Sequence, residues 1–123
     1  MNSSTIAPLL QIIIACGLLN VWLLRFNRNT AYRGGNATTL VEEFAVYGLS
    51  PSFCYAIGTL KVGSALVLLL GLKLPFLVAP AAALVAGLMI GAVAMHAKVK
   101  DPIKKAVPAT LMLAMSVALY LSV

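Results

Sequence analysis

The residue best placed to do chemistry is Lys61, which lies near the middle of the apolar stretch formed by residues 51–72. A charged side chain at the centre of a membrane helix costs about 2.5–3.5 kcal/mol, and each neighbouring Leu, Ile or Val returns only about 0.3–0.6 kcal/mol. Such a lysine normally faces the interior of a helix bundle, where it meets a partner or a ligand. We therefore predict that Lys61 points inward and organises the polar interior.

Five further residues can share a site with Lys61, because each carries a polar or titratable group. Cys16, Asn20 and Ser116 lie in other apolar segments, near the depth expected for Lys61, and His96 ends a third segment. Glu43 is the carboxylate that can fold in from the connection after the first segment. The predicted ligand-binding set is therefore Lys61, Cys16, Asn20, Glu43, His96 and Ser116, with no catalytic residue among them.

The role of Lys61 stays open at this stage. One interpretation gives it an anionic or carbonyl-bearing ligand, and another pairs it with Glu43. In a third, the amine is neutral and bonded to hydroxyls and carbonyls. In a fourth, Lys61 is a structural residue whose side chain snorkels along its helix or meets another subunit. His96 is open in the same way: it relays protons, donates to a quinone-like carbonyl, or is only an interfacial polar residue.

Other chemistry is disfavoured by the residues present. One histidine and no inward-facing acidic cluster argue against a metal site. Cys16 and Cys54 are expected at depths that differ by about 10 Å or more, too far apart for a disulfide, and no CxxC pair is present. We interpret both cysteines as buried apolar thiols and do not expect an autonomous enzyme.

The elements that position these residues follow from hydropathy. Hydrophobic residues make up 62% of the chain and charged residues 10%, far from the composition of a soluble domain. Four apolar segments, residues 6–24, 51–72, 75–95 and 106–123, each approach the roughly 20 residues that a spanning helix needs. We predict an all-α integral membrane protein, a single domain over residues 1–123, whose core is a four-transmembrane-helix bundle. Ser50 and Asp101 are the predicted N-caps of the second and fourth spans.

The connection between the first two spans contains one more element. Thr39 and Glu42 have the spacing of a capping box, and the following apolar positions recur with helical periodicity. The spacing predicts a short amphipathic helix over residues 39–48, packed by Leu40, Val41 and Phe44 onto the bundle or the interface. In the third span, Ala83, Gly87 and Gly91 recur every four residues, a pattern that favours close helix contact within the chain or between copies.

Basic residues predict the orientation in the membrane. The first and third connections carry seven, against Lys73 alone on the other side: Arg25, Arg28, Arg33, Lys98, Lys100, Lys104 and Lys105. The positive-inside rule then places these two connections in the cytoplasm and both termini outside it. The net charge of +6 indicates attraction to anionic membrane lipids, not nucleic-acid binding.

Five segments together resemble the DoxX-like membrane protein family, in order and over almost the whole chain. They are residues 30–37 (TAYRGGNA), 42–49 (EEFAVYGL), 57–62 (IGTLKV), 80–82 (PAA) and 95–102 (MHAKVKDP). The resemblance implies a four-helix membrane bundle. Relatives in this family have been linked to a thiosulfate:quinone oxidoreductase, to oxidative-stress membrane complexes and to a chaperone for nicotinic acetylcholine receptors. Because these roles differ so much, the resemblance implies the fold and does not select one function.

Two functional hypotheses follow. In the first, the protein is an accessory membrane subunit whose pocket around Lys61 holds a quinone, a lipid or another carbonyl-bearing ligand. In the second, it is an assembly factor, or a structural subunit of a larger membrane complex, and Lys61 contacts a partner protein or a second copy.

Overall fold

The computed structural model describes residues 3–28 and 30–123, and every regular element in that part is helical. Helix α1 spans Ser3–Leu19 and continues as a π-helical segment, η1, over Asn20–Leu24. The short helix α2 spans Leu40–Val46, and α3 spans Pro51–Leu70. A 3-10 turn, η2, at Pro75–Leu77 leads into α4 at Val78–Lys98, and α5 covers Ile103–Ser122.

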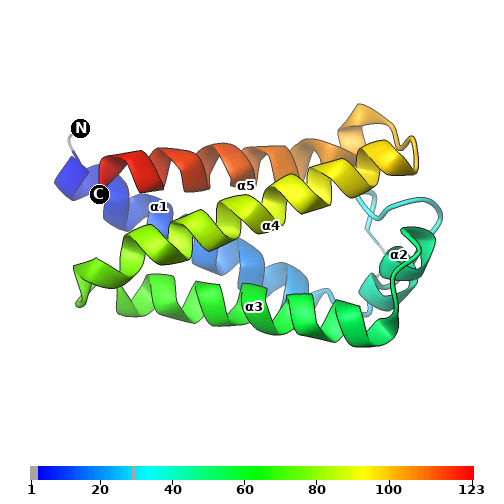
Figure 1. The fold of residues 1–123 in the computed structure, drawn as a ribbon, viewed down its shortest axis with the longest axis horizontal. Helices are drawn as coiled ribbons and strands as arrows, with labels where there is room; N and C mark the ends of the chain where they lie inside the picture. The colour runs from blue at the N-terminus through cyan, green and yellow to red at the C-terminus, as the bar shows by residue number, and fades with distance from the viewer. Residues whose placement is uncertain (1–2, 29) are drawn as a thin grey trace.

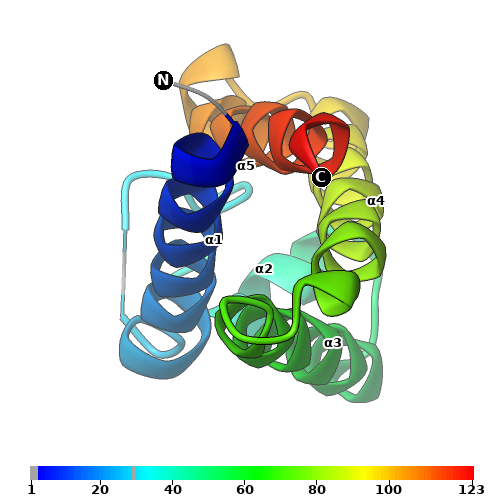
Figure 2. The ribbon, with the colours of Figure 1, turned by 90° about the vertical axis from the view of Figure 1, so that its left-hand side faces the viewer.

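Four of these helices are long and apolar enough to cross a membrane, namely Thr5–Leu24, Pro51–Leu70, Pro75–Lys98 and Ile103–Ser122. They form an up-and-down bundle in which α1 packs on α3 and α5, while α4 packs on α3 and α5 (Figure 2). The connections after η1 and after α4 lie at one end, beside α2, whereas α1 begins and α5 ends at the other (Figure 1). The predicted all-α, four-span, multi-pass membrane protein is confirmed.

The predicted amphipathic helix is also confirmed. Thr39 caps α2 by accepting a hydrogen bond from the Glu42 N–H at 3.2 Å, and Leu40 and Phe44 are buried against the bundle. The helix ends earlier than predicted, at Val46. The cause is Gly48, whose positive φ of 84° reverses the chain and lets the Leu49 N–H donate to the Phe44 carbonyl at 2.8 Å.

Of the two predicted N-caps, one is right and one is wrong. Ser50 accepts from the Phe53 N–H at 3.2 Å and caps α3, with Pro51 in the first turn. Asp101 does not cap α5, because its carboxylate accepts from the Gly35 N–H and lies beside His96 instead. A long-range contact has therefore replaced the local one.

The packed core has two parts, which leave space between them. One lies toward the chain ends and includes Ile14, Leu68, Val85 and Leu119, and the other joins Trp22, Leu40, Phe44 and Cys54 next to α2. Large apolar side chains such as Leu66 and Ile90 cover the outer surface, as expected for helices that face lipid. The prediction of two buried thiols is wrong for Cys16, which is free but exposed on this outer surface; Cys54 is free and buried.

Candidate functional site

A cavity of about 780 Å³ lies inside the bundle, in the half next to α2. All four spans and α2 contribute to its walls, which are mainly apolar. The apolar lining includes Leu18, Ile57, Leu88, Met89, Met95 and Met112. Helix α4 starts close to α3 and runs obliquely away from it toward the α2 end (Figure 1). This divergence leaves room that side chains of the two core clusters do not fill.

Glycines on α4 keep this room open. A Cβ added at Gly87 or Gly91 would meet no atom within 4 Å, and both residues line the cavity. The prediction that this row of small residues makes a close helix contact within the chain is therefore wrong for these two positions. The reason is the oblique course of α4, which carries this face away from its neighbours.

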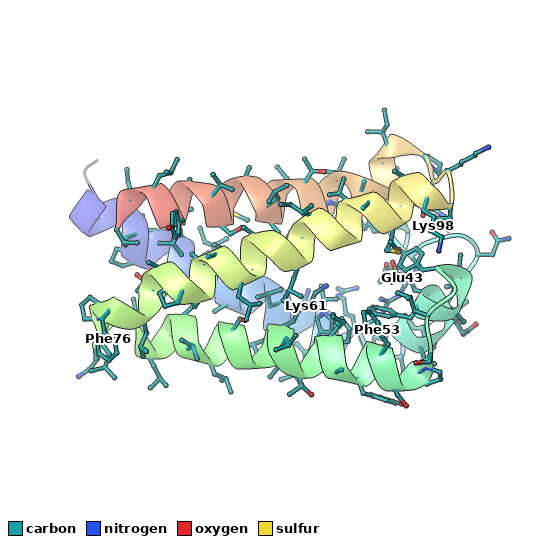
Figure 3. All side chains as sticks on the ribbon, viewed as in Figure 1. Glu43, Phe53, Lys61, Phe76 and Lys98 are labelled. Carbon is teal, nitrogen blue, oxygen red and sulfur yellow. The ribbon has the colours of Figure 1, made fainter. Side chains whose placement is uncertain are left out.

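Lys61 projects from α3 into this cavity, and only 9% of its surface is exposed. In Figure 3, Lys61 and Glu43 both lie between the ribbons of α3 and α4, with Glu43 nearer to α2. The Lys61 Nζ atom lies 5.2 Å from the centroid of the Trp22 ring, a cation–π contact. Within residues 3–28 and 30–123, no acceptor lies within hydrogen-bonding distance of this atom.

The contact with Trp22 offsets only part of the cost of the buried amine. A cation–π contact contributes about 0.5–2 kcal/mol, against about 2.5–3.5 kcal/mol for placing a lysine at the helix centre. The predicted inward orientation of Lys61 is confirmed, and its hydrogen-bonding capacity is left open toward the cavity.

Two local features bring Trp22 to this place. The π-helical segment Asn20–Leu24 closes with a hydrogen bond of 2.9 Å from the Arg25 N–H to the Asn20 carbonyl, which changes the direction of the side chains that follow α1. On the facing helix, a Cβ at Gly58 would come within 2.6 Å of the Trp22 ring. Trp22 therefore lies directly on the bare backbone of α3, one turn from Lys61.

At the α2 end, the cavity is bordered by a buried polar network centred on Glu43. The Glu43 carboxylate forms an ion pair of 3.3 Å with Arg33 and accepts from the Tyr47 hydroxyl at 2.7 Å and the Gly34 N–H at 3.0 Å. A Cβ at Gly34 would lie within 2.5 Å of the Tyr47 hydroxyl oxygen, so the absence of a side chain there makes this arrangement fit. The His96 Nε2 atom lies 4.0 Å from the same carboxylate.

Arg33 connects the network to the end of the first span. Its guanidinium donates to the backbone carbonyl of Arg25, and to that of Arg28 at 3.1 Å. Only 5% of the residue is exposed, and its Nε has no hydrogen-bond partner among the described residues. Arg33 therefore folds the connection back over the cavity and fixes it there.

Asp101 joins the first connection to the third. Its carboxylate lies 2.7 Å from His96 Nδ1 and accepts from the Gly35 N–H at 3.0 Å, while Lys105 donates to the Gly35 carbonyl. Gly35 has a positive φ of 54°, a conformation that glycine adopts at little cost. A further bond of 2.9 Å runs from Lys98 Nζ to the Tyr47 carbonyl. The two connections thus form one cap over the bundle.

The surroundings shift the pKa of two groups in this cap. Burial raises the pKa of the Tyr47 hydroxyl, and the charge of Glu43 and its hydrogen bond raise it further, so Tyr47 stays a neutral donor. For Asp101, burial acts to raise the pKa. The hydrogen bonds from His96 and the Gly35 N–H, with the charges of His96 and Lys105, outweigh burial and hold the pKa below its ordinary value.

The structure brings together four of the six predicted ligand-binding residues. Lys61, Glu43 and His96 line the cavity from three different elements, and Asn20, itself exposed, lines its margin. Cys16 lies on the outer surface. Ser116 is buried but donates to the Met112 and Leu113 carbonyls of its own helix and does not line the cavity. The part of each residue in ligand binding stays a prediction.

The sequence prediction missed four residues that form the site: Trp22, Arg33, Tyr47 and Asp101. Trp22 and Tyr47 resemble ordinary members of an interfacial aromatic belt, and Arg33 was counted only as a charge that orients the protein. A usable signal exists for three of them, because Arg33, Tyr47 and Asp101 lie in the segments that resemble the DoxX-like family. These segments meet in space at the cap.

Comparison with known proteins agrees with this grouping. The sequence model of the DoxX-like family matches residues 18–119, from the end of α1 to the last turn of α5. No curated protein and no solved structure matches the chain. The match covers all four spans at least in part, together with the cap and all of the cavity lining except Gly17, and on this basis the chain belongs to the DoxX-like family.

Proposed function

We propose that this protein is a small accessory subunit of a membrane complex and binds a quinone, a lipid or a similar carbonyl-bearing ligand in the cavity around Lys61. The observation that carries the proposal is the Lys61 amine. It is buried, it faces a cavity of about 780 Å³, and no described residue accepts a hydrogen bond from it. A buried donor left in this state is costly, and a ligand oxygen removes that cost.

The rest of the cavity supports a hydrophobic ligand. Its volume falls within the range of about 300–1,000 Å³ that is usual for small-molecule sites, and such sites combine apolar walls with a few polar groups. Three methionines, Met89, Met95 and Met112, contribute flexible walls that adapt to an irregular ligand. Lys61 supplies the polar contact at one end, and His96 lies at the other.

An accessory role, in place of independent catalysis, is supported by how the ionisable groups are used. Glu43 is engaged with Arg33, Tyr47 and the Gly34 N–H, and Asp101 with His96 and the Gly35 N–H. These contacts hold the cap together. In the proposed orientation the cap faces the cytoplasm, where a soluble or membrane-bound partner reaches it, and both termini face the opposite side.

The test is purification from native membranes followed by mass spectrometry of bound small molecules, for the wild type and two variants. Lys61→Met removes the amine and keeps an unbranched side chain. Leu60→Met is the matched control, because Leu60 is the adjacent residue of α3 and is exposed on the outer surface. We expect a stoichiometric hydrophobic compound with the wild type and Leu60→Met, reduced about tenfold or more in Lys61→Met. Equal amounts in all three proteins, or none in any, would contradict the proposal.

A second candidate function, an assembly factor or structural subunit, is favoured by a groove on the outer surface. This groove has a volume of about 480 Å³ and lies between η1 and α3, where Thr59 and Gly63 present little side-chain bulk. A Cβ at Gly63 would meet nothing within 4 Å, so a helix of another protein can approach closely. On this hypothesis, a photo-crosslinker at Thr59 in native membranes gives discrete protein adducts. The control is a photo-crosslinker at the exposed Leu111, where only lipid adducts are expected. Lipid adducts alone at Thr59 would argue against the hypothesis.

A further inference from the structure

The ionisable groups around the cavity do not balance. Four cationic side chains line it, Arg25, Arg33, Lys61 and Lys105, against two carboxylates in the cap, Glu43 and Asp101. Arg33 pairs with Glu43 at 3.3 Å, and Lys105 lies 4.0 Å from Asp101. Arg25 is exposed, so Lys61 is the buried cation left over, and in the described part of the chain no carboxylate lies within ion-pair distance of its Nζ atom.

The nearby carboxylate does not supply the missing charge. Glu43 acts on Lys61 electrostatically across the cavity. However, both of its oxygens are held by groups of the cap: one by Arg33, the other by the Tyr47 hydroxyl and the Gly34 N–H. Turning Glu43 toward Lys61 would leave Arg33 buried without its counterion, and breaking a buried pair in this way is strongly unfavourable. The cap thus keeps Glu43, and Lys61 needs an anion from elsewhere.

We infer that the ligand beside Lys61 is a long-chain carboxylic acid, whose carboxylate pairs with the Lys61 ammonium while its chain lies along the apolar walls of the cavity. The inference rests on the proposed function and narrows its ligand to one chemical class. A neutral quinone or a neutral lipid would accept a hydrogen bond from Lys61 but would leave the charge unbalanced. A carboxylate accepts the hydrogen bond and also balances the charge, so that both partners of the contact are ionised.

The depth of Lys61 favours a carboxylate over a phosphodiester. Ten residues of α3 separate Lys61 from Pro51 at the start of the helix, which corresponds to about 15 Å along its axis. A phosphodiester stays ionised, so its head group would have to move from the membrane interface into the apolar interior while carrying its charge. A carboxylic acid can enter in its protonated, neutral form. Its proton is then released to solvent as the carboxylate pairs with the Lys61 ammonium, so the site ends with one negative and one positive charge and no net charge.

The chain carries its own reporter for the test. Trp22 is the single tryptophan, and its ring lies 5.2 Å from Lys61 Nζ, so a brominated ligand in the cavity quenches its fluorescence. The protein, in nanodiscs of zwitterionic phosphatidylcholine, is titrated with dibrominated stearic acid, with the methyl ester of the same acid, and with a short-chain alkylated benzoquinone. The acid and the ester differ in the charge of the head group and share the same chain. The comparison therefore isolates the pairing with Lys61.

We expect the acid to bind the wild type at least about tenfold more tightly than the ester. Lys61→Met should abolish this preference, and Lys61→Arg should keep most of it. The exposed control Leu60→Met should behave as the wild type. Equal binding of acid and ester to the wild type, or an acid preference that survives in Lys61→Met, overturns the inference, and the first of these outcomes needs no variant to fold.

The remaining outcomes separate the inference from the proposed function. If the benzoquinone binds in a Lys61-dependent manner and the acid does not, the carboxylate is wrong and the ligand cavity stands. If none of the three compounds quenches Trp22 beyond the level seen in Lys61→Met, both the carboxylate and the ligand-binding function are refuted.

Discussion

Replacing Glu43 by glutamine is the most direct perturbation of the cap. Removing one partner of a buried ion pair costs about 3–5 kcal/mol, because the other charge stays buried without compensation. Arg33, 5% exposed, keeps its bonds to the Arg25 and Arg28 carbonyls, and the amide oxygen of the introduced glutamine still accepts one bond from Tyr47 or Gly34. We therefore expect the lower end, about 3 kcal/mol, which is more than about a hundredfold in the equilibrium between the docked and the undocked cap.

Amide hydrogen exchange in nanodiscs measures this equilibrium directly. The Gly34 N–H donates to Glu43 and the Gly35 N–H to Asp101, so the protection of these two amides reports docking of the first connection onto the third. The matched control is Glu42→Gln on the same helix. Glu42 is exposed, and within the described residues its carboxylate accepts only from the Thr38 and Thr39 hydroxyls; Gln preserves the capping box. The control should change protection by less than about threefold. Similar protection of both amides in the two variants would refute the assignment of Glu43 as the counterion of Arg33.

Three further predictions test other parts of the structure. Gly58→Ala places a Cβ within 2.6 Å of the Trp22 ring and should shift the fluorescence emission of this single tryptophan. The control Gly87→Ala, where the Cβ meets nothing within 4 Å, should leave the emission unchanged, and identical spectra of the two variants would contradict the packing of Trp22 on α3. Since the pKa of Asp101 lies below its ordinary value of 3.8, its carboxylate stabilises docking above that pH, and the contribution is lost as the pH falls through the lower value in the folded state. Asp101→Asn should remove this acid-dependent part of Gly35 protection, measured relative to the intrinsic exchange rate, and an unchanged acid response in the variant would show that another group titrates. A cysteine at position 123 should react with an impermeant reagent from the non-cytoplasmic side, and labelling only after the cytoplasmic face is opened means that the orientation is inverted.

Hydropathy and local capping patterns were enough to predict the architecture and the presence of one special group. Spans of about 20 apolar residues can be located from hydropathy alone, because a spanning helix satisfies its own backbone hydrogen bonds and needs no information from distant residues. The caps of α2 and α3 are equally local, since Thr39 and Ser50 bond to N–H groups three residues away. The inward orientation of Lys61 follows from the cost of exposing an amine to acyl chains.

Which polar groups meet depends on the packing of the helices and their connections. Asp101 has the sequence context of an N-cap but bonds to Gly35, 66 residues earlier in the chain, and Glu43 pairs with Arg33 instead of turning to Lys61. Cys16 lies on the outer surface, and Ser116 donates to carbonyls of its own helix, so neither lines the cavity. Depth follows from counting residues along a helix, but the direction of a side chain depends on the rotation of that helix about its axis. In spans that are apolar on the inner and the outer face alike, hydropathy does not encode that rotation, and only the packing of one helix on another fixes it.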